Sequence, residues 1–103
     1  MAESFSLKYT TESDLFTFDF VAMLASGETI STAVCTVVVM DGVDASPSSI
    51  ISGTATISNT QVSQRIINGV ADVTYRLIMT ITTSASNTFV GIGDLRVAAT
   101  NVI

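Results

Sequence analysis

Several residue types that carry chemistry are scarce or missing in this chain of 103 residues. There is no histidine, which removes the commonest general base and metal ligand and makes a serine–histidine or cysteine–histidine nucleophile impossible. The single cysteine, Cys35, excludes an internal disulfide and a thiolate metal site. It lies within an apolar run, where a free cysteine usually acts as a small core residue. These absences argue against an enzyme, a cofactor and a metal site.

Positive charge is also scarce. Four lysine and arginine residues stand against nine acidic residues, which gives a net charge of −5 and a pI of about 4.1. The cations are Lys8, Arg65, Arg76 and Arg96. They form no basic stripe, which argues against binding to nucleic acid or to an anionic membrane surface. No apolar run approaches the ~20 residues that span a bilayer, and the N-terminus has no signal-peptide pattern.

Charge of either sign is low, at 13% of the residues, and the mean hydropathy is +0.57. Serine, threonine and alanine fill most positions outside the apolar pattern, so this surface is weakly protected against association. Threonine also suits β-strands, so one interpretation is simply a threonine-rich β-protein. The alternative, which we favour, is that much of this surface is buried in an assembly.

The clearest pattern in the chain is a long alternation across residues 71–84. Its apolar positions are Val73, Tyr75, Leu77, Met79 and Ile81, and polar residues lie between them except at Ile78. A period of two places the two sets on opposite faces of a strand. A strand of this length needs a second sheet to cover its apolar face, so we expect it to be the central strand of a β-sandwich.

Further strand patterns occur at residues 1–11, 14–20, 29–40, 50–57, 61–67 and 88–98. Turn residues separate them, Asn68-Gly69 is a type I′ hairpin signal, and Gly53 is a candidate bulge. Gly91 and Gly93 are expected to weaken or kink the last strand. About seven strands without a convincing amphipathic helix predict an all-β sandwich, with residues 1–103 forming one domain.

The run at residues 29–40 has no clean alternation, because Ile30 and Val34 share one phase while Cys35 and Val37 share the other. Two interpretations fit. A bulge near Ala33 reconciles the two halves, or the strand is central and covered on both faces.

The N-terminal segment, residues 1–11, carries Phe5, Leu7 and Tyr9 on alternate positions. It is either the first strand of the sandwich or an arm that adds to the sheet edge of a neighbouring subunit. At the other end, Val102 and Ile103 are apolar residues that a neighbour would have to cover. We therefore expect these five residues to be protein contacts.

Two acidic pairs are the only candidates for carboxylate catalysis: Asp41 with Asp44, and Glu12 with Asp14. Both pairs occur where turns are expected, and turns favour acidic residues. Residues 41–44 also resemble a fragment of a calcium loop, but a real loop needs several more oxygen ligands. We therefore interpret these carboxylates as solvated turn residues.

Two serine-rich loops, at residues 44–49 and 84–87, resemble adaptable binding loops. The chain has no tryptophan and neither loop contains tyrosine, so no sugar-stacking platform is apparent. Carbohydrate binding is kept as the alternative function.

Two blocks of sequence resemble small immunoglobulin-like β-sandwich proteins from the structural-gene clusters of tailed bacteriophages. The first block spans residues 14–30, and its matching positions are Phe16, Phe18, Asp19, Leu24, Gly27, Thr29 and Ile30. The second spans residues 69–84 and matches at Tyr75, Ile81, Thr82 and Thr83. The chain departs from the pattern at Phe20, Met23 and Cys35, each at or near a usual tryptophan position, and at Glu28, which replaces aspartate.

This resemblance implies an immunoglobulin-like antiparallel sandwich and a structural role in the virion. The protein is then a capsid decoration (cement) protein or a neck or tail adaptor that contacts other virion proteins and forms a homo-oligomer. It would be made in the bacterial cytoplasm and carried in the particle. The alternative is a carbohydrate- or host-surface-binding module displayed on the virion.

Overall fold

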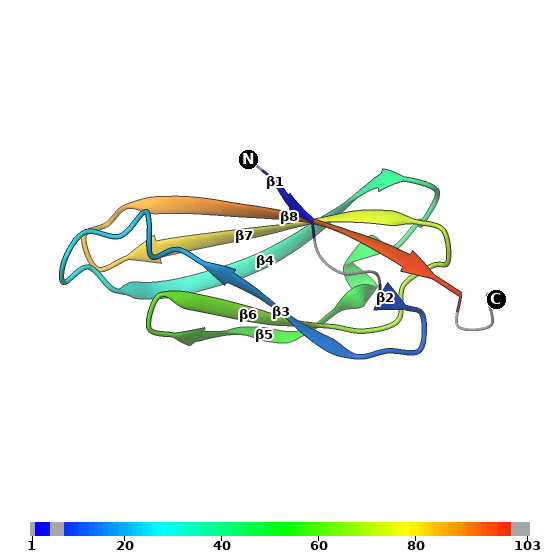
Figure 1. Ribbon diagram of the computed structural model, residues 1–103, viewed down its shortest axis with the longest axis horizontal. Helices are drawn as coiled ribbons and strands as arrows, with labels where there is room; N and C mark the ends of the chain where they lie inside the picture. Colours follow the sequence, from blue (N-terminus) through cyan, green and yellow to red (C-terminus); the bar gives the residue numbers. More distant parts are fainter. Residues whose placement is uncertain (1, 5–7, 100–103) are drawn as a thin grey trace.

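The computed structural model describes residues 2–4 and 8–99, and it places two β-sheets face to face (Figure 1). The large sheet contains β1 (Ala2–Ser4), β2 (Lys8–Tyr9), β8 (Thr88–Ala98), β7 (Thr74–Thr83) and β4 (Ile30–Asp41). The small sheet has the order β3 (Asp14–Asp19), β6 (Gln61–Ile66) and β5 (Ile51–Ser58). A short 3₁₀ helix, η1 (Pro47–Ile50), precedes β5.

Strand β7 is the centre of the large sheet, as its sequence pattern predicts. It lies between β8 and β4, and its residues alternate strictly between buried and half-buried. The side chains of Tyr75, Leu77, Met79 and Ile81 are fully buried. They pack against the small sheet, where Phe16 and Phe18 contribute the aromatic inner face of β3. The core is therefore the layer between the two sheets.

The strand order confirms the predicted all-β sandwich. Strands β3, β6 and β5 share one sheet while β4, β7 and β8 share the other, which is the division found in immunoglobulin-like sandwiches. Tyr75, near the start of β7, accepts a hydrogen bond from the backbone N–H of Val70 at 2.9 Å. This contact resembles the tyrosine corner of such folds. One departure from an antiparallel fold is that β1 and β2 pair parallel with β8.

Strand β4 is an edge strand, so the interpretation that it is central and covered on both faces is wrong. The bulge interpretation is confirmed. The pairing with β7 shifts register between Ile30 and Thr32, slightly before the expected position near Ala33. The extra residue, Ser31, is anchored by its hydroxyl, which donates to the carbonyl of Thr82 at 2.8 Å. Beyond this bulge, alternate side chains point inward from Ala33 and outward from Val34.

The hairpin predicted at Asn68-Gly69 is wrong. Both residues have the positive φ values of a type I′ turn, 54° and 104°, but β6 and β7 belong to different sheets. The segment crosses between the sheets and passes close to β8, because a Cβ on Gly69 would lie 3.0 Å from a methyl group of Val97. The connection continues with a hydrogen bond from the N–H of Asp72 to the carbonyl of Val97 at 2.8 Å.

The remaining glycine predictions have mixed outcomes. Gly53 has a φ of 72°, and the β5–β6 pairing shifts register between Ser52 and Thr56, so the predicted bulge is confirmed. Strand β8 is not broken at its glycines, since its pairing with β7 runs without a register shift. A Cβ on Gly91 would lie 3.0 Å from the ring of Phe18, so this position must stay small for the ring to pack.

The N-terminal segment pairs with its own chain where it is described, as the first-strand alternative predicts. The sequence pattern groups Tyr9 with the apolar positions of this segment, but the structure buries its neighbour instead. Lys8 is 1% exposed whereas Tyr9 is 40% exposed. The ammonium group of Lys8 donates to the backbone carbonyls of Tyr9 and Asn68, which satisfies the buried charge with hydrogen bonds. Desolvation lowers the pKa of Lys8, and the nearby Glu12 and Asp14 oppose this effect.

Candidate protein-binding surfaces

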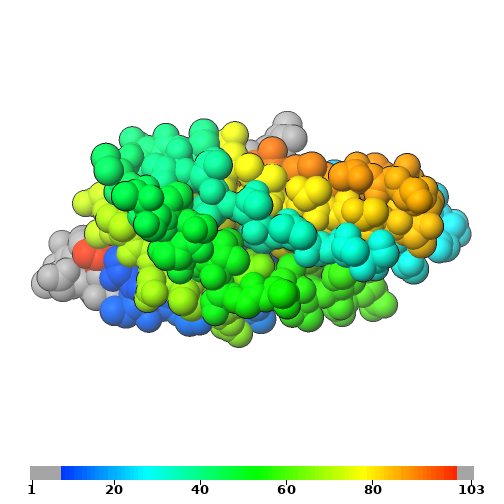
Figure 2. All heavy atoms as spheres, turned by 180° about the vertical axis from the view of Figure 1, so that it is seen from behind, coloured from blue at the N-terminus to red at the C-terminus, as the bar shows by residue number. Residues whose placement is uncertain are grey.

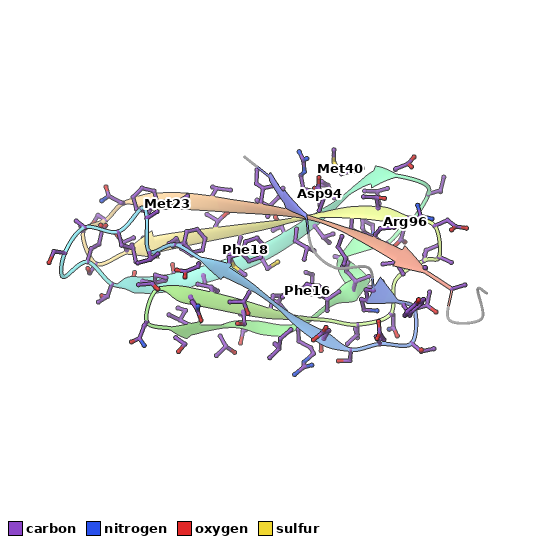
Figure 3. All side chains as sticks on the ribbon, in the orientation of Figure 1. Phe16, Phe18, Met23, Met40, Asp94 and Arg96 are labelled. Atoms are coloured by element: carbon purple, nitrogen blue, oxygen red, sulfur yellow. The ribbon has the colours of Figure 1, made fainter. Side chains whose placement is uncertain are left out.

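The outward side of the large sheet carries a patch of apolar side chains that we call the apolar outer face. It consists of Val34, Val38, Met40, Ile78, Val90 and Ile92. Val34 is 60% exposed, Met40 49% and Val90 45%. Figure 3 shows Met40 projecting on the side of the large sheet that faces away from Phe16 and Phe18. Contiguous exposed apolar surface of this kind marks interaction sites in soluble proteins.

Cross-strand pairing assembles this face from three strands. Val34 lies opposite Thr80, which lies opposite Val90, and Ile78 lies opposite Ile92. The apolar side chains therefore lie in neighbouring rows across β4, β7 and β8, and each row also contains a threonine or the Arg76–Asp94 pair. Ile78, the residue that interrupts the polar phase of β7 in the sequence, occupies the middle of these rows.

One ion pair lies within the apolar outer face. Arg76 and Asp94 are register partners on β7 and β8, and their side chains make two hydrogen bonds of 2.8 and 3.1 Å. Hydrogen bonding to Arg76 holds the pKa of the Asp94 carboxyl below its usual range. Because the two charges neutralise each other, this surface differs from the rest of a chain whose net charge is −5.

The outward side of the small sheet is different in composition, and we call it the polar outer face. It consists mainly of polar residues, together with one large apolar side chain, Leu15, which is 48% exposed. The polar residues are Thr17, Asp19, Thr56, Ser58, Gln61, Ser63 and Arg65. Its middle row joins Thr17, Ser63 and Thr56, and the hydroxyls of Thr17 and Ser63 are 2.8 Å apart. Apart from Leu15, these side chains carry hydrogen-bonding groups, so they offer little apolar area to a partner.

A pocket of about 100 Å³ opens beside the apolar outer face, between β3 and β8. Its lining includes Phe20 and Met23 from the β3 side and Val90 and Ile92 from β8. Met23 is 46% exposed and extends the apolar surface beyond the edge of β8. The pocket has the size of one apolar side chain, which makes it a candidate anchor point for a partner.

Of the acidic residues singled out in the sequence, Asp14 begins β3 and Asp41 ends β4, so these two lie in strands rather than in turns. Asp44 accepts hydrogen bonds from the Tyr75 hydroxyl at 2.7 Å and from the N–H of Ser46 at 2.9 Å. Glu12 accepts from the N–H of Tyr9 at 2.8 Å, and Asp14 accepts from the adjacent N–H of Leu15. Among the described residues no group of three or more His, Cys, Asp or Glu is placed to hold a metal ion.

Tyr75 and Asp44 form a buried polar contact at one end of the large sheet. Burial raises the pKa of the Tyr75 hydroxyl to about 12, and the neighbouring carboxylate of Asp44 adds to this effect. The tyrosine therefore keeps its proton and donates to Asp44 at neutral pH. This contact ties β7 to the loop that follows β4.

The two sequence blocks that carry the phage resemblance meet at the opposite end of the sandwich. Glu28 of the first block accepts hydrogen bonds from the Thr83 hydroxyl of the second block, from the side-chain amide of Asn87 and from the N–H of Ala25. These bonds lower the pKa of Glu28, the one from Ala25 most strongly. Glu28, which departs from the family pattern, and Thr83, which matches it, thus hold a loop junction together, which is a structural role.

The serine-rich loops do not combine into one site. Asp41 pairs with the start of β7 at Thr74, whereas the loop at residues 84–87 follows the end of β7 at Thr83. Ten residues of strand separate the two loops by about 30 Å. A carbohydrate site built from both loops is therefore excluded by their placement.

The predicted contact residues are only partly visible. Phe5, Leu7, Val102 and Ile103 lie outside the described residues, and Tyr9 pairs with Ala98 of its own β8. Sequence reasoning missed the apolar outer face, although the mixed phase of residues 29–40 was its signal. Half of that apolar run faces the core, and the other half, including Val34 and Val38, faces outward.

Cys35 is half-buried and packs against the core, in keeping with its expected role as a small apolar residue. Burial raises the pKa of its thiol to about 11, so it is a poor nucleophile at neutral pH. Within the described part of the chain, no helix has the length and apolar character needed to cross a membrane.

Comparisons with known proteins give one positive finding. A family model described as "Podophage GP4 fiber-tail adaptor protein gp77" matches residues 8–91, which is most of the chain. The matched stretch contains both blocks of the resemblance and all but one residue of the apolar outer face, Ile92 being just outside it. A search of curated proteins finds no match.

Proposed function

The chain belongs to the podophage GP4 fiber-tail adaptor protein gp77 family and is a phage virion structural protein; from this premise we propose that it joins two components of the tail. Its means of attachment is the apolar outer face, which binds another virion protein. The family description supports a place in the tail over the capsid decoration suggested by the sequence resemblance alone.

The observation that carries this proposal is the difference between the two outer faces. A sandwich needs only its inner faces to fold, and the small sheet meets water mainly with hydroxyl, amide and charged groups, with Leu15 as an exposed apolar residue among them. The large sheet instead exposes Val34, Met40 and Val90, each by more than 40%. Such exposure has no benefit for an isolated domain, but it fits a surface that a partner covers.

The neutral ion pair at the centre of the face suits this role. Arg76 and Asp94 already satisfy each other, so covering them does not leave an unpaired charge. The pocket beside β8 lies at the border of the same surface and accepts one apolar side chain of the partner. Together they describe a flat apolar contact with one anchor point.

The test compares one aspartate on each outer face. Val90→Asp places a charge on the apolar outer face, and Thr56→Asp places the same charge on the polar outer face as the matched control. Each variant is supplied to a phage that lacks the gene, and its amount in purified particles is measured after separating tails from capsids. Burying an unpaired charge at an interface should lower incorporation of Val90→Asp by about tenfold or more, with Thr56→Asp unchanged.

Unfolding temperatures of both purified variants show whether either change affects the fold itself. Equal incorporation of the two folded variants would contradict the assignment of the apolar outer face. Recovery of the wild-type protein with capsids rather than tails would contradict the tail position.

A further inference from the structure

Strand β4 presents a bare backbone edge. It ends the strand order of the large sheet, so β7 is its only sheet partner among the described residues. Its twelve residues extend over about 40 Å. From Ile30 to Met40 the strand contains no charged residue and no proline, the usual protection of a free edge. Its two register shifts lie near its ends, which leaves a regular stretch from Thr32 to Val39.

We propose that this edge pairs antiparallel with β4 of a second copy of the chain, about a two-fold axis at Thr36. The pairing would join two large sheets into one continuous sheet. This inference rests on the β4 edge alone and does not depend on the proposed tail function.

Symmetry and side-chain fit select the register. Residues that face each other across antiparallel strands point to the same side of the sheet, whereas neighbouring residues of one strand point to opposite sides. In a symmetric pair of strands, one residue must therefore face its own copy, and the two-fold axis passes between these two residues. With the axis at Thr36, Val34 faces Val38 of the second copy and Cys35 faces Val37. This register covers two valines that are 60% and 43% exposed, and it places threonine opposite threonine, a favourable cross-strand pair. An axis at Cys35 would instead place Val34 opposite Thr36.

Charge does not oppose the pairing of two copies along this edge. Copies of a chain with net charge −5 repel each other over most of their surfaces. Along β4 the first charge is Asp41, which lies beyond the regular stretch from Thr32 to Val39. No like charges therefore meet along the paired strands.

The structure also leaves room beside the edge. A groove of about 160 Å³ lies between β4 and β5, with Ala33 and Cys35 on one side and Gly53 and Ala55 on the other. Figure 2 shows these two strands, teal and green, next to each other on this side of the molecule. Inward-pointing side chains of an added strand, such as Val37 of the second copy, would lie over this groove.

The pairing has a consequence for binding. Because the two copies share one sheet, their apolar outer faces would lie side by side on the same surface. The area offered to a third protein would be about twice that of one copy.

The first test exchanges charges at the facing positions. Val34→Lys combined with Val38→Lys places lysine opposite lysine at two contacts, and it should weaken self-association by about tenfold or more. Val34→Lys combined with Val38→Glu places opposite charges at the same contacts and should restore association. Val34 and Val38 are both exposed in the isolated chain, so neither double variant disturbs the core. Light scattering across a concentration series measures the mass.

A wild-type protein that stays monomeric at millimolar concentration would overturn the proposal. Equal association of the two double variants would overturn it as well, because only facing positions distinguish these charge patterns.

The second test reads the register directly. In a Cys35→Ser background, Thr36→Cys should be linked to its symmetry mate by a short bifunctional thiol reagent. Val34→Cys in the same background is the control, because its symmetry mate lies about 13 Å away along the strand. Linking of the Val34→Cys control but not of Thr36→Cys would overturn the register.

Discussion

The two sheets cover the same core but meet their surroundings in opposite ways. On the small sheet a row of Thr17, Ser63 and Thr56 faces outward, and the hydroxyls of Thr17 and Ser63 bond to each other. On the large sheet the corresponding surface exposes Val34 and Val90. Both sheets fold with apolar inner faces, so the outer composition is free to differ without altering the fold. The difference is the basis of the proposal that the outer face of the large sheet binds another protein.

The largest expected effect separates the two sides of β7. Leu77→Ala removes a fully buried side chain and should lower the free energy of unfolding by about 3 kcal/mol, through lost burial and a cavity. Ile78→Ala, the next residue, removes an outward-facing side chain and should cost under about 1 kcal/mol. Urea unfolding measures both. Equal losses of unfolding free energy in the two variants would contradict the distinction between the inner and outer sides of β7. The apolar outer face would then contribute to stability as much as the core does.

A smaller effect tests the buried polar contact of the large sheet. Tyr75→Phe leaves Asp44 and the N–H of Val70 without their partner, which should lower the free energy of unfolding by about 1–3 kcal/mol. The pKa of Tyr75 is raised from 10.0 to about 12. Between those values the unfolded chain releases the proton while the folded chain keeps it, so wild-type stability should fall as pH rises.

The comparison of wild type with Tyr75→Phe across this pH range isolates the tyrosine, because the opposite contribution of Lys8 is common to both proteins. The stability difference between them should shrink towards high pH. A constant difference would show that Tyr75 titrates alike in the folded and unfolded chains. The buried polar contact of the small sheet cannot be tested in this way. Gln64 donates to the carbonyls of Ser52 and Gly53, and its amide does not titrate.

The smallest effects concern the outer faces themselves. Val90→Thr makes the large sheet resemble the small one, and Thr17→Val does the reverse. Each should change the free energy of unfolding by about 0.5 kcal/mol or less, because both side chains are exposed. Binding of a hydrophobic dye should fall for Val90→Thr and rise for Thr17→Val. An unchanged dye signal in both variants would mean that neither face is recognised as apolar surface.

The sequence was sufficient for most of the fold. Alternation from Val73 to Ile81 predicted a buried central strand, and the separate strands predicted at residues 50–57 and 61–67 correspond to β5 and β6. Periodicity reports which face of a strand is buried, and this information is local. The parallel pairing of β1 and β2 with β8 is not local, and no pattern in residues 1–11 distinguishes it from antiparallel pairing.

The binding surface was harder to predict for a related reason. In β4 an apolar outward face and an apolar inward face give the same continuous run as a strand buried on both sides. Only the strand order reveals that β4 is at an edge and that Val34 and Val38 meet solvent. Lys8 was missed because its buried ammonium depends on the carbonyl of Asn68, which is distant in sequence.

The position of the N-terminal segment limits how far the large sheet can grow. Strand β8 at the other side of that sheet is covered by β1 from Ile92 to Asp94 and by β2 at Val97 and Ala98. A filament that grows by strand pairing needs two unpaired sheet edges on every subunit. Here β1 and β2 already pair with part of the β8 edge. Strand addition at the remaining side would stop after a single step and yield a finite particle rather than a filament.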